Sequence, residues 1–233
     1  MPFRRPRLLV LLALGIATVV IAVASATSLT VAPVKANAFR VCALSGYPGT
    51  SAAALDTYDS QENRNKNEGT NTGMLISGRT NKAKLAYLRF DLSKCSPALA
   101  PTAVVKQATL RLFLQTQASS SRTYGAYRVD GASCPEGLST CWGETSTTWN
   151  NRPSSVSTAT GTVTIPTGVA NANKLYAWNV TTDVVKFVAG TAANYGWSIA
   201  DTTTDAGTLD AKFTSVEAGT ATDAPRLVIV YSP

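Results

Sequence analysis

The sequence predicts an all-β fold, a sandwich or a barrel, on three observations. Strand signals bounded by turn residues recur about every ten to twenty residues after residue 50. Helical periodicity is nearly absent from the same region, which is rich in Thr, Ser, Ala, Gly, Val and Tyr. Residues 84–91 and 106–115 alternate between two faces, one of them apolar, which is typical of strands with one buried face.

The expected elements follow from these signals. We expect strands at 53–58, 74–77, 84–91, 106–115, 124–129, 174–180, 195–200, 211–217 and 226–231. One segment, 181–189, has a helical pattern instead: Thr182 can cap its start, Asp183 lies in its first turn and Gly190 ends it. The fold is therefore expected to carry a single short helix that closes one end of the sandwich.

The N-terminal segment has the pattern of a secretory signal. Arginines within the first seven residues precede an uncharged apolar run that ends near Ala26. Small residues fit cleavage after Ala26 or after Ala38, so we predict a signal peptide over 1–38 and a single domain over 39–233. A retained membrane anchor is the alternative, because the run of about 19 residues is long enough to span a bilayer. No basic stop-transfer cluster follows the run, which favours cleavage.

The charge of the mature chain argues against nucleic acid as a partner. Four of the 21 basic residues precede residue 39, which leaves 17 Lys and Arg against 14 Asp and Glu. No dense basic stripe remains of the kind that nucleic-acid binding requires. We expect a secreted protein, extracellular or associated with the cell wall, with no membrane contact after cleavage. Its mildly basic surface is compatible with an acidic polysaccharide.

The four cysteines are expected to form disulfides, because their number is even and the chain is exported. Cys134 and Cys141 bracket a short segment, so we pair them, and this leaves Cys42 to pair with Cys95. A zinc site is not expected, since the chain has no His and only one close pair of cysteines.

Most catalytic arrangements are missing, so we expect no enzyme activity. Without His there is no Ser-His-Asp or Cys-His constellation, and no phosphate-binding or dinucleotide-binding loop occurs. Two carboxylates could still serve glycoside hydrolysis, and Tyr, Lys and Arg could serve a lyase. No diagnostic spacing favours either reaction.

The candidate ligand-binding residues are aromatic and cationic. If strands 84–91 and 106–115 are neighbours, their outward positions form one patch, which contains Tyr87, Arg89, Arg111 and Phe113. Guanidinium groups can grip carboxylated or sulfated sugars in a bidentate way, and aromatic rings stack on sugars. Trp142, in a polar loop, is expected to be exposed and to contribute as an outlying contact. The competing interpretation pairs each arginine with a structural acid.

An acidic segment near the C-terminus offers the one candidate metal site. Asp201, Asp205 and Asp210 lie within ten residues, among Thr and Gly. Extracellular proteins bind calcium through such oxygens, so structural calcium is the only cofactor considered. The spacing matches no defined calcium loop, and a solvated turn is the alternative.

Several motifs, in order, resemble a known family. They are Asp56-Thr57-Tyr58, Gly73-Met74-Leu75-Ile76, Tyr87-Leu88-Arg89-Phe90-Asp91-Leu92-Ser93, Ala108-Thr109-Leu110-Arg111-Leu112, Trp142-Gly143-Glu144 with Thr147-Thr148-Trp149-Asn150-Asn151-Arg152-Pro153, Trp178-Asn179-Val180-Thr181, and Phe213-Thr214-Ser215-Val216-Glu217 with Ala224-Pro225-Arg226-Leu227. Together they resemble DNRLRE-domain proteins over about residues 53–232. The resemblance implies a jelly-roll-like β-sandwich on secreted or surface proteins. It also implies kinship with carbohydrate-binding modules, some linked to alginate-type acidic polysaccharides.

The expected function is therefore that of a secreted, non-catalytic carbohydrate-binding module for a cell-wall or extracellular polysaccharide, which would be an acidic one if the arginines bind it. Two alternatives stay open. One is a structural or adhesive surface protein without sugar specificity, and the other is a small polysaccharide-active enzyme.

Overall fold

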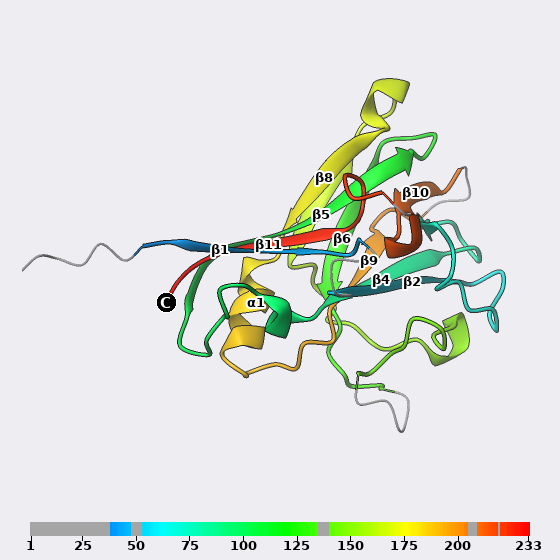
Figure 1. Cartoon of the computed structure of the whole chain (residues 1–233). Helices are drawn as coiled ribbons and strands as arrows, with labels where there is room; N and C mark the ends of the chain where they lie inside the picture. The colour runs from blue at the N-terminus through cyan, green and yellow to red at the C-terminus, as the bar shows by residue number, and fades with distance from the viewer. Residues whose placement is uncertain (1–37, 48–52, 135–139, 205–208, 219) are drawn as a thin grey trace, which may run out of the picture. The chain divides into compact units, whose positions relative to one another are not determined.

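The chain folds into two antiparallel β-sheets with one helix, as Figure 1 shows for the computed structural model. The structure describes residues 38–47, 53–134, 140–204, 209–218 and 220–233. The predicted all-β sandwich is confirmed, whereas the predicted signal segment up to residue 37 lies outside the described residues. Among the residues that are described, no helix is long and apolar enough to cross a membrane.

The larger sheet has six strands in the order β1-β11-β5-β10-β3, with β8 on the other edge of β5. Its strands are β1 (Arg40–Ser45), β3 (Gly73–Ile76), β5 (Val104–Thr116), β8 (Lys174–Asn179), β10 (Ala211–Thr214) and β11 (Arg226–Ser232). The long strand β5 organises this sheet, because β11 and β10 share one of its edges and β8 occupies the other.

The smaller sheet has five strands in the order β2-β4-β9-β6-β7. Its strands are β2 (Ala54–Ser60), β4 (Lys84–Phe90), β6 (Arg122–Arg128), β7 (Gly161–Ile165) and β9 (Trp197–Asp201). Short 3-10 turns occur in the described connections: η1 (Leu92–Lys94), η2 (Trp149–Asn151), η3 (Val169–Asn171) and η4 (Val216–Ala218).

The observed elements differ from the predicted ones in few places. Strands β1 and β7 were not expected; both are short and lie at sheet edges, where a strand needs less apolar sequence. The helix α1 (Thr181–Val188) forms as predicted, but its N-cap is Val180 rather than Thr182. It ends before Gly190, whose φ of +68° suits glycine.

The core lies between the sheets and is built around aromatic side chains. Phe213 of β10 contacts Trp178 of β8 and Tyr124 of β6 edge-on, with ring centroids 6.0 and 5.7 Å away. The indole Nε1 of Trp178 donates a hydrogen bond of 2.8 Å to the carbonyl of Tyr124. Since Trp178 and Tyr124 belong to opposite sheets, this bond and these ring contacts join the two layers.

The outer face of the smaller sheet is covered as well. The connection between β6 and β7 runs across it and places Trp142 and Cys141 against Tyr87 and Val129, all of them buried. The strand β4, which lies between β2 and β9, is therefore covered on both faces, although its sequence alternates like a strand with one solvent-exposed face. This covering connection carries much of the candidate site.

Both predicted disulfides are present. Cys42–Cys95 joins β1 to the segment that follows η1, across a sequence separation of 53 residues, and Cys134–Cys141 closes a loop with a separation of 7. The first ties β1 to the connection between β4 and β5, and the second lies within the covering connection.

The two disulfides should differ in their effect on stability, because a crosslink that closes a longer loop removes more entropy from the unfolded chain. Replacing both Cys42 and Cys95 with Ser should lower the free energy of unfolding by about 4 kcal/mol, and the corresponding change at Cys134 and Cys141 by about 2 kcal/mol. Urea denaturation without reductant measures both. An equal or reversed order would contradict this account.

Candidate functional site

The structure does not bring the predicted aromatic and cationic patch together. Tyr87 and Arg89 lie on β4 in the smaller sheet, and Arg111 and Phe113 lie on β5 in the larger one. The two strands are not neighbours, because β4 pairs with β2 and β9 while β5 pairs with β8, β10 and β11. The hypothesis of one continuous patch depended on adjacency and is wrong on that point.

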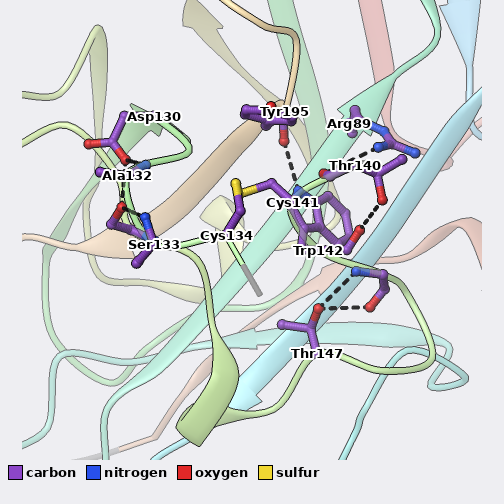
Figure 2. Close-up of a disulfide and its surroundings, with 12 residues drawn as sticks. Arg89, Asp130, Ala132, Ser133, Cys134, Thr140, Cys141, Trp142, Thr147 and Tyr195 are labelled. Atoms are coloured by element: carbon purple, nitrogen blue, oxygen red, sulfur yellow. Dashed lines mark hydrogen bonds between the residues drawn. A yellow bond between two sulfur atoms is a disulfide. The ribbon is translucent and has the colours of Figure 1, made fainter. Parts of the chain in front are cut away.

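Tyr87 and Trp142 are buried rather than exposed, each with 1% of its surface accessible. Their ring centroids lie 5.9 Å apart, and Trp142 Nε1 donates to the Tyr195 carbonyl at 2.7 Å (Figure 2). The expected exposure of Trp142 is wrong because its loop folds down onto the sheet. Neither ring can stack on a sugar, and both support the residues around them.

Arg89 is the predicted site residue that reaches the surface beside this pair. Its guanidinium lies over the Trp142 ring at 5.9 Å from the centroid, and its Nη1 donates to the Thr140 carbonyl at 3.4 Å (Figure 2). Partial burial lowers its pKa from the ordinary arginine value. Within the part of the chain that the structure describes, no carboxylate lies within salt-bridge distance of Arg89, so the competing structural ion pair is not formed there.

An open pocket of about 470 Å³ lies next to Arg89. We call it the Arg89 pocket. It is lined by the start of β2, the end of β4, the covering connection and the segment before β9: Ala53, Ala54, Leu55, Arg89, Phe90, Asp91, Thr140, Asn194 and Tyr195. Its volume falls in the range of small-ligand sites, and its wall mixes apolar surface with a few polar groups.

The polar groups of the Arg89 pocket suit a ligand rich in hydroxyls. Asn194 donates from Nδ2 to the Phe90 carbonyl at 2.8 Å, while its buried Oδ1 has no hydrogen-bond partner among the described residues. Asp91 is exposed and adds a carboxylate, and Arg89 adds N–H donors. No sequence pattern distinguishes Asn194, Tyr195 or Thr140, because they come together only when the loops fold.

Gly196 allows the wall that contains Asn194 and Tyr195 to approach β4. Its φ is +79°, and a Cβ atom there would lie 2.0 Å from the Leu88 carbonyl oxygen. A side chain at this position would push the start of β9 away from β4, so glycine is required both for the conformation and for the contact.

Arg111 and Phe113 lie on the outer face of the larger sheet. Arg111 is exposed and has no ion pair with any described residue, and Phe113 is half-buried. The strands of this sheet, all described, contain no acid and six basic residues: Arg40, Lys106, Arg111, Lys174, Lys212 and Arg226. Arg111 pairs directly across from Arg226 in the register. Arg40 and Lys174 pair with the inward-facing Tyr231 and Leu114, whereas Lys106, Arg111 and Arg226 lie on the outer face. The outer face therefore carries a second cationic surface, separate from the Arg89 pocket.

The acidic segment predicted to bind calcium has other partners in the structure. Asp201 lies 3.5 Å from Nη1 of the buried Arg122, and Asp210 forms ion pairs with Arg79 and Lys84. Asp205 lies outside the described residues, so calcium binding by all three stays a prediction. The carboxylates of Asp201 and Asp210, the two described members of this group, already have cationic partners.

A different group of carboxylates converges without a cation. Asp56 of β2, Glu144 of the covering connection and Glu217 of η4 each place a carboxylate oxygen within 4.8 Å of the others. Burial, followed by the charge of Glu217, raises the pKa of Asp56 well above its usual value, and burial also raises the pKa of Glu144. All three residues occur in the motifs singled out in the sequence, although no local spacing connects them.

The comparison with protein families agrees with this architecture. Residues 48–231 match the sequence model of carbohydrate-binding module family 96, and the chain belongs to that family. No curated protein matches the chain. The predicted kinship with carbohydrate-binding modules is confirmed, while the DNRLRE name and an alginate-type ligand stay predictions.

One buried acid beneath the covering connection should make stability depend on pH. Asp59 is fully buried; it accepts hydrogen bonds of 3.3 Å from Tyr87 Oη and from the Leu85 N–H, and Arg152 Nε lies 3.9 Å away. Burial is the largest influence, and it raises the pKa of Asp59 to about 7 despite the lowering effect of Arg152.

We therefore expect the protein to lose stability as pH rises through about 7. The folded state holds the Asp59 proton more tightly than the unfolded state, so this contribution is fully present below the unfolded pKa near 4 and is lost as the carboxyl ionises. Melting temperatures at pH 5 and pH 8 should differ more for the wild type than for Asp59→Asn. Equal differences in both proteins would show that Asp59 does not titrate in this range.

Proposed function

We propose that this chain is a secreted, non-catalytic carbohydrate-binding module that holds an acidic polysaccharide by one sugar unit in the Arg89 pocket. The observation that carries the proposal is the pocket itself. It has a volume of about 470 Å³, it has hydrogen-bonding groups suited to a sugar, and it occurs in a member of a carbohydrate-binding module family.

The pocket chemistry supports an acidic rather than a neutral ligand. Arg89 feels the charge of Asp91 but forms no salt bridge within 4.0 Å to a described carboxylate. Trp142 and Thr140 hold it from one side, so its remaining N–H groups can face a uronate or sulfate group. The exposed carboxylate of Asp91 can accept hydrogen bonds from sugar hydroxyls. Cations on the larger sheet would add long-range attraction for a polyanion.

The non-catalytic part of the proposal rests on the composition of the pocket. Among the described residues of its wall there is one carboxylate, Asp91, and no second one at a separation suited to glycoside hydrolysis. The described groups of the pocket suit binding, and a carbohydrate-binding module acts by attaching to its glycan.

Arg89 and Arg111 form a matched pair for testing the position of the site, since each substitution removes one positive charge. Arg89→Ala should weaken binding of polyuronate oligosaccharides about tenfold or more, whereas Arg111→Ala should change it by about twofold or less. Isothermal titration calorimetry at two salt concentrations measures both, and binding should weaken with salt.

The outcomes of that experiment separate the candidate functions. Loss of binding in Arg111→Ala alone would move the site to the outer face of the larger sheet. Absence of binding to acidic and neutral polysaccharides by the wild type would favour the structural or adhesive alternative. Melting temperatures of both variants control for unfolding, because Arg89 also packs on Trp142.

Secretion has its own test. Because small residues precede two cleavage points, the exported protein should begin at Thr27 or at Phe39. N-terminal sequencing of protein recovered from the culture medium gives the answer directly. A chain that keeps Met1 and sediments with membranes would contradict the predicted signal peptide.

A further inference from the structure

We infer that Asp56, Glu144 and Glu217 bind a single calcium ion that fastens the covering connection to both sheets. We call these three residues the carboxylate trio. They come from β2 in the smaller sheet, from the connection between β6 and β7, and from η4, which precedes β11 of the larger sheet. This inference does not depend on the proposed glycan site.

The separation of the carboxylates fits one ion. Calcium binds protein oxygens at about 2.3–2.6 Å, so two oxygens on opposite sides of one ion lie about 4.6–5.2 Å apart. The three oxygens of the trio all lie within 4.8 Å of one another. Each can therefore contact the same calcium ion with little movement of the backbone.

The trio contains acceptors that nothing in the described chain satisfies. Asp56 is 1% exposed, and the donor to its carboxylate from outside the trio is the Val216 N–H, at 2.8 Å from Oδ2. Glu217 lies within hydrogen-bonding reach of Asp56 and Glu144, but carboxylates bond to one another only when one of them holds a proton. Oε2 of Glu217 is shut off from solvent and has no hydrogen-bond partner. A buried carboxylate without enough donors or a counter-charge destabilises a fold, so such a group needs a cation or a proton.

No described Lys or Arg forms an ion pair with this cluster. Among the described ion pairs, Lys or Arg side chains neutralise Glu62, Asp201 and Asp210, but none lies within 4.0 Å of a carboxylate of the trio. Three acids from distant parts of the sequence are instead pointed at each other. Repulsion among three ionised carboxylates at this spacing destabilises the fold unless a cation lies between them or they hold protons.

Hydrogen bonds around the trio hold its backbone in position and leave carboxylate oxygens available to a ligand. Glu144 accepts a hydrogen bond of 3.2 Å from the Asp56 N–H, which joins the covering connection to β2. Asn67 Nδ2 donates at 2.8 Å to the carbonyls of Glu144 and Thr147. The loop that carries Glu144 is thus anchored through its backbone, and the carboxylates can be directed toward an ion.

The ligand type selects calcium. The trio offers only carboxylate oxygens, which hard cations prefer, and contains no His or Cys of the kind that zinc prefers. Magnesium requires a tighter octahedron at about 2.0–2.1 Å and retains its waters, whereas calcium accepts irregular sets of six to eight oxygens. Backbone carbonyls or water would complete such a set.

Calcium titration of the mature, disulfide-intact protein tests the inference. After treatment with a chelator, a free calcium concentration about 100 times Kd should raise the melting temperature by about 5–10 °C, because the ion binds the folded state only. Calorimetry should find about one bound calcium per chain, with weaker binding of magnesium. Absence of any calcium response in the wild type would overturn the inference and indicate that the carboxylates share protons.

Variants locate the ion. Glu217→Gln and Glu144→Gln should each lose the calcium response, while Glu62→Gln, which changes the charge equally at an exposed ion-paired acid, should keep it. Binding measured by calorimetry keeps the test valid if a variant is less stable. Retention of the full response in both trio variants would place calcium elsewhere, for example at Asp201, Asp205 and Asp210, and would refute the assignment.

Discussion

The packing of Trp142 on Tyr87 is the contact on which the surface of the smaller sheet depends. It covers a sheet face that alternation in the sequence would leave open, and it buries both rings. The indole N–H holds the Tyr195 carbonyl, and the indole face lies beneath Arg89. The two walls of the Arg89 pocket are therefore fixed by one side chain, which itself is not exposed to a ligand. The adjacent Cys134–Cys141 bond limits how far the loop can move away (Figure 2).

Charge is distributed unequally between the two sheets. The strands of the larger sheet contain basic residues and no acid, whereas the smaller sheet buries Asp56 and Asp59 on β2. Each buried acid needs a way to lower its electrostatic cost. The carboxyl of Asp59 accepts a hydrogen bond from the Tyr87 hydroxyl and lies 3.9 Å from the Arg152 guanidinium. Its pKa is raised, so it can also lower the cost of burial by holding a proton. For Asp56 the structure supplies one backbone donor and two further carboxylates, which is the basis for inferring an ion there.

The sequence predicted the parts of the fold that depend on local patterns. Alternation identified β4 and β5, and the 181–189 helix and both disulfides were found where expected. Arg89 is the one residue of the Arg89 pocket that was predicted to bind ligand. The other polar groups of the pocket come from loops, which have no periodic pattern in the sequence. The burial of Tyr87 and Trp142 could not be predicted, since alternation shows which residues share a face but not what covers that face. The carboxylate trio depends on contacts between residues as far apart as 56 and 217, which no spacing rule detects.

The most direct test of the account is to map the glycan onto the protein by amide chemical shifts in ¹⁵N-labelled mature protein titrated with a uronate oligosaccharide. The account predicts that the largest changes occur at Leu55, Arg89, Thr140 and Tyr195, the backbone positions around the Arg89 pocket. Strands β5 and β8 on the far sheet should change little. Largest changes at Arg111 and Phe113, with none around Arg89, would contradict the assignment of the site.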